Sequence, residues 1–246
     1  MLTIVKAPPN LGQFSTPHEG EEIVYWEDPR SLLWLTRSFA NKAFNRIVRF
    51  YEPQQDKFSC GPASLAIVLN ALRVGRCENL PTDPMHEEFA RKNAAQLPKD
   101  YQATFCKFTQ RNIFAADPEQ SLEQIYQGSY GLNLEKCRQL LLANGVSAET
   151  RLVNNEDHSE EAANICQVLS SDDFYIIANF DRKVWGLDGG GHISPIAAYD
   201  PVSSKALIVD VNPCGRWLWI DIDLLLKSMA THDGDSQRGY LIATNR

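Results

Sequence analysis

An apolar run that begins directly at a cysteine restricts the fold of this chain more than any other feature. A polar segment, residues 54–59, leads to Cys60, and an apolar segment then continues to Leu72. Apolar side chains recur there at helical spacing, at Leu65, Val68, Leu69 and Leu72. Pro62 suits the first turn of a helix, where its missing N–H costs nothing. The pattern predicts a helix with a thiol at its N-terminus, where unpaired N–H groups and the helix dipole favour the thiolate.

The composition is that of a globular protein with a sizeable core. The chain has 246 residues, 43% of them hydrophobic, and a formal net charge of −7. This length suits one large domain or two small lobes. Lysines and arginines form no basic stripe, so nucleic acid is not expected as a partner. No membrane partner is expected either, because no apolar run approaches the length of a bilayer span and residues 1–9 lack a signal peptide's apolar centre.

The six cysteines are spread along the chain, at Cys60, Cys77, Cys106, Cys137, Cys166 and Cys214. They form no C-x-x-C pair and no Cys/His cluster, so no metal site is predicted. Five of them suit the interpretation of small, mostly buried hydrophobes. We expect a cytoplasmic protein, although a mature periplasmic form without its leader would have a similar sequence.

The apolar periodicity changes along the chain from helical to strand-like. Residues 1–30 suit an extended arm, and helices are expected over residues 31–44, 60–72, 134–143 and 160–170. Strands are expected over residues 174–180, 192–199, 205–211, 216–220 and 239–244, with a short helix over residues 221–230. Helices followed by a mostly antiparallel sheet indicate an α+β fold. We expect one domain over residues 1–246, with a helical lobe to about residue 150 and a sheet lobe after it.

Two polar residues flank a predicted hairpin turn. Three glycines, residues 189–191, precede His192 at the start of one strand, and Asp210 ends the next strand. If the hairpin folds about residues 201–203, the even offsets put both side chains on one face of the sheet. The Asp210 carboxylate then holds the imidazole in one tautomer, and the other ring nitrogen faces Cys60. A thiol, an imidazole and a carboxylate placed this way build an acyl-transferring nucleophile.

Gln54 lies six residues before the cysteine. Its amide is a candidate to join the Cys60 backbone N–H in stabilising an oxyanion. Each of these residues also has a simpler interpretation, as a core cysteine, a satisfied strand histidine or an aspartate that caps a turn. A carboxylate that follows the apolar residues 206–209 is costly to bury without a partner, however. The set together favours catalysis over the structural alternatives.

These segments resemble the phytochelatin synthase family, a group of papain-like cysteine transpeptidases. The matching stretches are residues 54–72, with the pattern Q-x5-C-G-x-A-S-L-A-x-V-L-N-A-L, and residues 181–199, which contain G-G-H-I-S-P-I-A-A-Y. Residues 206–211 follow at the family's His-to-Asp spacing, and residues 9–11 with 19–20 are similar to its entry segment. The resemblance covers nearly the whole chain, with gaps around residues 75–120.

The resemblance implies a papain-like fold, catalytic roles for Cys60, His192 and Asp210, and Gln54 in the oxyanion hole. It implies that the thiol attacks the Cys–Gly bond of glutathione, glycine leaves and a γ-glutamylcysteinyl thioester remains. Water then releases γ-glutamylcysteine, or the amine of a second glutathione accepts the acyl group and a phytochelatin forms. No tightly bound cofactor is implied, and divalent cadmium or zinc enters as a glutathione thiolate complex of the substrate.

The resemblance also implies substrate binding by four further residues, Asp233, Arg238, Gly191 and Arg182. Asp233 would take the ammonium of the γ-glutamyl group and Arg238 its carboxylate, to which a fork-shaped guanidinium is suited. The segment between Asp233 and Arg238 is shorter than in the family. The simpler interpretation of these two residues is a surface loop and an arginine at a strand edge.

Two departures from the family favour hydrolysis over chain growth. The sequence shows no cysteine-rich C-terminal domain, so it resembles the short bacterial form. The arginine that the family often has after the catalytic aspartate is Pro213 here, and Arg216 is the candidate to replace it. We therefore expect a glutathione-cleaving cysteine peptidase with some transferase capacity, and the sequence is compatible with a homodimer.

Two other functions stay open from the residues themselves. Residues 54–65 also permit another papain-like peptidase that acts on a different peptide or amide. The six cysteines permit a non-enzymatic thiol or metal-binding protein, although their separation argues against it.

Overall fold

The structure is a computed structural model that describes residues 23–76, 84–98, 106–117, 121–128, 131–154 and 158–245. Its α-helices are α1 (Pro29–Arg37), α2 (Phe44–Arg49), α3 (Cys60–Leu72), α4 (Pro84–Lys92), α5 (Leu122–Gly128), α6 (Leu134–Ala143), α7 (Ser159–Leu169) and α8 (Ile222–Met229). Two 3₁₀ helices are η1 (Asn112–Ala116) and η2 (Arg182–Trp185). Among these residues no helix is both long enough and apolar enough to cross a membrane.

One antiparallel sheet forms the centre of the fold, in the order β1-β6-β5-β4-β3-β9-β2. Its strands are β1 (Ile23–Tyr25), β2 (Ser147–Leu152), β3 (Phe174–Asp181), β4 (Gly191–Asp200), β5 (Lys205–Ile208), β6 (Leu218–Asp221) and β9 (Gly239–Thr244). A separate short hairpin pairs β7 (His232–Asp233) with β8 (Ser236–Gln237). The expected α+β class with an antiparallel sheet is therefore confirmed.

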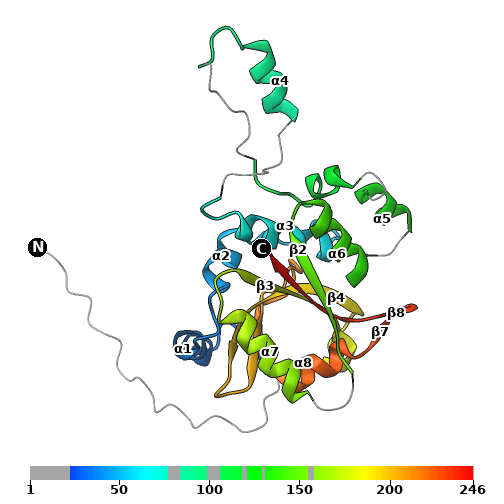
Figure 1. The fold of residues 1–246 in the computed structure, drawn as a ribbon. Helices are drawn as coiled ribbons and strands as arrows, with labels where there is room; N and C mark the ends of the chain where they lie inside the picture. Colours follow the sequence, from blue (N-terminus) through cyan, green and yellow to red (C-terminus); the bar gives the residue numbers. More distant parts are fainter. Residues whose placement is uncertain are drawn as a thin grey trace, which may run out of the picture.

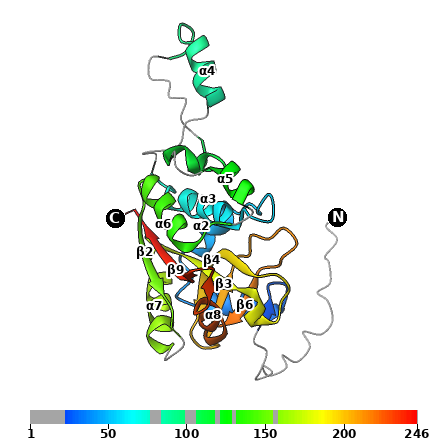
Figure 2. The same cartoon turned by 90° about the vertical axis from the view of Figure 1, so that its right-hand side faces the viewer.

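Helices cover the sheet on both sides. Figures 1 and 2 show α3 and α6 on one side and α7 and α8 on the other. All thirteen residues of α3 are buried, from Cys60 to Leu72. The helix begins at the predicted residue and has Pro62 in its first turn. Because α3 is buried along its whole length, its position is set by packing on every side, and the thiol at its start has little freedom to move.

The ends of the sheet differ from the prediction. Residues 23–25 form the edge strand β1, whereas an extended arm was expected there. The proposed boundary near residue 150 falls inside β2, the opposite edge strand, so the sheet draws on both halves of the chain. Both strands lack a clear apolar alternation, since β1 is only three residues long and β2 is half-exposed and polar.

The expected helix over residues 31–44 is wrong in its second half: α1 ends at Arg37, and the next helix, α2, begins only at Phe44. The break follows from the extended backbone of Ser38, at the C-terminal end of α1. Residues 9–11 and 19–20, which carried the resemblance to the family's entry segment, and Cys77 lie outside the described residues.

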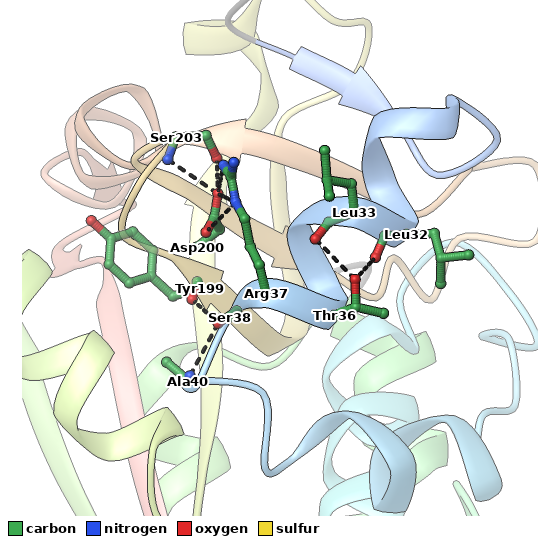
Figure 3. Close-up of polar contacts among 9 residues, drawn as sticks. All are labelled: Leu32, Leu33, Thr36, Arg37, Ser38, Ala40, Tyr199, Asp200 and Ser203. Carbon is green, nitrogen blue, oxygen red and sulfur yellow. Dashed lines mark hydrogen bonds and ion pairs between the residues drawn. The ribbon is translucent and has the colours of Figure 1, made fainter. Parts of the chain in front are cut away.

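A buried carboxylate ties the turn between β4 and β5 to α1. Asp200 is fully buried; it accepts hydrogen bonds from the backbone N–H of Ser203 (3.1 Å) and from its hydroxyl (2.5 Å), and it pairs with Arg37 of α1. Next to this pair, the Ser38 hydroxyl donates to the Tyr199 carbonyl at 2.5 Å (Figure 3). Because a buried carboxylate needs such partners, these contacts fix the length and shape of the turn.

This turn is longer than the sequence pattern suggested, and a bulge corrects the register. Asp200 pairs with Lys205 across a four-residue turn, so even-numbered residues of β4 face odd-numbered residues of β5. Between Ala198 and Ile196 the register shifts by one, and Ile196 then pairs with Ile208. The bulge therefore returns the even-numbered residues of both strands to one face of the sheet.

Candidate active site

The nucleophile candidate lies where α3 meets β4. Cys60 is the first residue of the helix, and its side chain is only 8% exposed. One turn later, the Ser64 hydroxyl donates to the backbone carbonyl of Ile193 at 3.0 Å. Ile193 follows His192 on β4, so this bond holds the helix of the thiol to the strand of the imidazole. Ser64 was not singled out from the sequence, although a fully buried hydroxyl always calls for a partner.

The structure brings together Cys60, His192 and Asp210, the three residues that were predicted to act together in catalysis. His192 Nε2 lies 2.7 Å from Asp210 Oδ1, and the imidazole is near enough to the Cys60 thiol for each group to shift the pKa of the other. With Nε2 bound to the carboxylate, Nδ1 is the nitrogen left for the sulfur. The Phe180 ring packs edge-on against the imidazole from the paired position on β3. The ring is thus fixed by contacts on two sides, as a general base requires.

Asp210 itself is held by the loop that follows β5. The backbone N–H of Asn212 donates to its Oδ1 at 2.8 Å. Gly215 packs so closely that an added Cβ would lie 2.6 Å from Asp210 Oδ2, so only glycine fits there. The Tyr51 hydroxyl donates to the backbone carbonyl of Asp210 at 3.0 Å. The predicted strand over residues 205–211 ends at Ile208, and these loop contacts orient the carboxylate in its place.

The electrostatics favour a thiolate beside an imidazolium. Burial by itself raises the pKa of the Cys60 thiol, but His192 and the backbone N–H groups of Ile193 and Gly61 lower it below its usual value. Burial by itself lowers the pKa of His192, but the hydrogen bonds with Asp210 and Cys60 outweigh it and raise the pKa to about 9. Burial by itself raises the pKa of Asp210, but the hydrogen bond and the charge of His192 lower this pKa below its usual range.

We expect the change Asp210→Asn to narrow the pH range of activity from both ends. The carboxylate stabilises the protonated ring, so its loss lowers the His192 pKa from about 9 and moves the alkaline limb to lower pH. A less stable imidazolium stabilises the thiolate less, so the Cys60 pKa rises and the acid limb moves to higher pH. We expect shifts of about one pH unit or more.

The measurement is kcat/KM against pH for both proteins, with glutathione, the substrate that the family resemblance implies. Glutathione titrates identically in the two assays, so a difference between the profiles belongs to the enzyme. Superimposable limbs in the two profiles would contradict the proposed coupling between Asp210 and His192.

Gln54 is fixed in the loop that leads into α3. Its backbone N–H donates to the carbonyl of Val211 at 2.7 Å, which ties it to the residue after Asp210. Its side-chain Nε2 donates to the carbonyl of Asp56 at 2.5 Å. An amide nitrogen carries two N–H groups, so the second one remains for another acceptor. The residue is buried, as a donor to an oxyanion inside a cleft would be.

Three of the four residues expected to bind substrate lie together: Arg238, Asp233 and Gly191. Arg238 is buried, and its Nη1 lies 3.3 Å from Asp233 Oδ2. The guanidinium packs on Gly191, where an added Cβ would come within 2.4 Å of Nη1. Gly191 directly precedes His192 on β4. A carboxylate and a guanidinium are therefore adjacent to each other and to the strand of the imidazole, whereas a surface loop and a strand edge were the simpler interpretation.

Asn179 is a member of this group that the sequence interpretation missed. Its Oδ1 accepts a hydrogen bond from Arg238 Nη1 at 3.0 Å, and the side chain is 1% exposed. Its Nδ2 has no hydrogen-bond partner among the described residues. The signal was present in the sequence, because Asn179 is the one polar residue between Phe174 and Phe180 in a strand that is otherwise apolar.

The two candidate arginines near Asp210 differ in position. Arg182 lies against Gly189, where an added Cβ would come within 2.7 Å of its Nη2, and its charge helps to lower the pKa of Asp210. Arg216 instead stacks on the Tyr25 ring at 3.5 Å and lies 3.8 Å from Glu27. Arg182 therefore contributes a favourable charge near the Asp210 carboxylate, while Arg216 is engaged by β1 and the residues after it.

The other cysteines of the described part are free thiols, at Cys106, Cys137, Cys166 and Cys214. Cys137 is fully buried, and burial raises its pKa well above the usual value. Among the described residues no three His, Cys, Asp or Glu side chains form a group that would hold a metal ion.

Comparison with known proteins assigns the chain to a family. Residues 20–240 match the family model described as phytochelatin synthase. The chain is 28% identical over 207 residues to glutathione gamma-glutamylcysteinyltransferase 3 of Lotus japonicus, a stretch that covers 82% of this chain and 37% of the relative. It is 27% identical over 195 residues to glutathione gamma-glutamylcysteinyltransferase of Schizosaccharomyces pombe, which covers 77% and 40%, respectively.

A third relative, glutathione gamma-glutamylcysteinyltransferase 1 of Arabidopsis thaliana, is 24% identical over 207 residues, 82% of this chain and 37% of the relative. The chain thus spans less than half the length of these curated relatives. Because the family model covers nearly the whole chain and the Cys60, His192 and Asp210 side chains meet in one site, this protein belongs to the phytochelatin synthase family.

Proposed function

We propose that this chain cleaves the Cys–Gly bond of glutathione by a papain-like mechanism, with Cys60 as nucleophile. The observation that carries the proposal is the group Cys60, His192 and Asp210: the thiol lies at the N-terminus of a buried helix and is electrostatically coupled to an imidazole that is hydrogen-bonded to the carboxylate, in a chain of this family. A papain-like fold is supported by the same arrangement, in which a helix presents the cysteine to an antiparallel sheet that carries histidine and aspartate.

In the proposed first half-reaction, the Cys60 thiolate attacks the carbonyl carbon of the Cys–Gly bond. The second N–H of Gln54 and the unpaired backbone N–H of Cys60 stabilise the oxyanion that forms, because N–H groups of a first helical turn lack intrahelical acceptors. The His192 imidazolium gives its proton to the glycine nitrogen, the C–N bond breaks and glycine leaves. The γ-glutamylcysteinyl group stays on the sulfur as a thioester.

In the second half-reaction, neutral His192 takes a proton from the attacking water, and the Cys60 thiolate leaves as γ-glutamylcysteine forms. The amine of a second glutathione can replace water, which gives a phytochelatin. We favour water, because Pro213 replaces the arginine that the family often has there, and Arg216 is engaged by Tyr25 and Glu27. Cadmium or zinc enters as a thiolate complex of glutathione, as part of the substrate.

The γ-glutamyl group of glutathione carries a free ammonium and a free carboxylate. Asp233 and Arg238 supply the complementary charges next to Gly191, at the start of the strand that holds His192. We propose that this pair binds the γ-glutamyl end, so that the peptide bond of the substrate reaches Cys60. Arg182, near Asp210 and Gly189, is the further candidate for substrate contact.

Mass spectrometry of the intact protein after brief exposure to glutathione tests this proposal. We expect an adduct of γ-glutamylcysteine without glycine, which peptide mapping places on Cys60. The thioester survives a phosphine reductant and is released by hydroxylamine, whereas a mixed disulfide with glutathione retains glycine and is released by the reductant. A mixed disulfide alone, or cleavage of a different peptide and not of glutathione, would contradict the proposal.

A further inference from the structure

A buried glutamine outside the predicted site holds the backbone on both sides of Gln54. Gln110 is 3% exposed and lies just before η1. Its Nε2 donates to the carbonyl of Pro53 at 2.9 Å, and its Oε1 accepts from the backbone N–H of Gln55 at 3.1 Å. One amide thus contacts an acceptor and a donor that flank the oxyanion candidate, and it shares the Gln55 N–H with the Ser59 hydroxyl, which lies 3.1 Å away.

The segment that carries Gln110 is itself attached to α3. The Asn70 side chain donates to the Phe108 carbonyl at 2.9 Å and accepts from the Phe108 backbone N–H at 2.8 Å. Asn70 lies near the end of the helix that begins at Cys60. Two amide clamps in series therefore place the loop of Gln54 relative to the same rigid helix that carries the sulfur.

We propose that Gln110 is a positioning residue that holds Gln54 at the oxyanion side of Cys60. The inference rests on the proposed oxyanion role of Gln54. Gln110 does not touch the reacting atoms; it acts through the Pro53 carbonyl and the Gln55 N–H. Oxyanion donors act only when they are held in place before the reaction, so a looser loop lowers kcat with little effect on substrate binding.

A neighbouring contact between the same two segments offers a matched control. Lys107 pairs with Glu52 at the surface, where the two side chains are 53% and 44% exposed. This pair links the segment of Gln110 to the loop before Gln54 but does not touch Pro53 or Gln55. An exposed pair of this kind contributes little to stability, so Lys107→Met should leave kcat unchanged.

A double-mutant cycle on glycine release from glutathione tests the inference. Gln54→Ala should lower kcat by about 10²-fold or more. Gln110→Met, which keeps the volume of the side chain, should lower kcat roughly tenfold at unchanged KM. In the Gln54→Ala background, Gln110→Met should have no further effect, because the side chain that it positions is gone.

The outcomes separate the inference from the function on which it rests. A wild-type protein that releases no glycine overturns the proposed function, and an unchanged kcat for Gln54→Ala overturns the oxyanion role and with it the inference. With Gln54→Ala impaired, a normal kcat for Gln110→Met, or an equal loss in both backgrounds, overturns the inference alone.

Hydrogen–deuterium exchange gives a readout that needs no substrate. Gln110→Met should speed exchange at the backbone N–H of Gln55, which among the described residues then keeps only its bond to the Ser59 hydroxyl, while Lys107→Met should not. Equal rates in the wild type and Gln110→Met would overturn the inference. If Gln110→Met does not fold, Gln110→Glu serves as the second variant, since it keeps the acceptor for Gln55 but loses the donor to Pro53.

Discussion

Cys60→Ala should lower glycine release from glutathione by about 10⁴-fold or more, because the variant has no nucleophile to form the thioester. His192→Ala should cause a similar loss, since the ring both stabilises the thiolate and protonates the leaving nitrogen. The double variant should be no slower than either single one, because residues that act as one unit lose their function together. The measurement is single-turnover release of glycine with enzyme in excess.

Cys166→Ala is the matched control for the loss of a thiol. Cys166 is half-buried in α7, and burial raises its pKa, opposite to the direction at Cys60. This variant should keep wild-type activity. Glycine release that persists in Cys60→Ala would refute the assignment of the nucleophile, whereas equal loss in Cys166→Ala would point to a general dependence on thiols.

The second large effect is expected at the buried charge pair. Arg238→Met should lower kcat/KM for glutathione by about 100-fold, since charge-assisted hydrogen bonds contribute roughly 1.5–3 kcal/mol and 1.4 kcal/mol is a tenfold change. Asp233→Asn should cause a loss of the same order through the substrate ammonium. The measurement is initial rates with glutathione and two analogues: glutaryl-cysteinylglycine, which lacks the ammonium, and 4-aminobutyryl-cysteinylglycine, which lacks the carboxylate.

The analogues assign each charge to its partner. Asp233→Asn should cost little with the analogue that lacks the ammonium, and Arg238→Met should cost little with the analogue that lacks the carboxylate. Arg138→Met, which breaks an exposed pair with Glu135 on α6, is the control and should leave all three substrates unaffected. Equal penalties on all three substrates in the site variants would assign Asp233 and Arg238 a structural role only.

Local sequence patterns predicted α3, α6 and β9 well. The helix that begins at Cys60 and the helix over Leu134–Ala143 lie where the apolar periodicity placed them. The strand over Gly239–Thr244 also has its predicted bounds. These elements have strong local signals, because apolar spacing and side-chain caps involve residues within a few positions of each other.

The edge strands β1 and β2, and the contacts that hold the loop around Gln54, could not be predicted in the same way. β1 is too short and β2 too polar to show an apolar period, and only pairing with β6 and β9 makes them strands. Gln110 contacts Pro53 and Gln55 across more than fifty residues of sequence, so no local pattern reports it. Asn179 had a local signal, but its partner Arg238 is distant in sequence.

The order of residues alone determined which groups are available for chemistry: a thiol at a helix start, an imidazole after glycines, and a carboxylate after an apolar strand. The tertiary structure decided whether they meet. The four-residue turn would put His192 and Asp210 on opposite faces, and the bulge near Ile196 returns them to one face. Side-chain direction alternates with every residue of a strand, so one residue of register decides a site, and packing between distant segments sets that register.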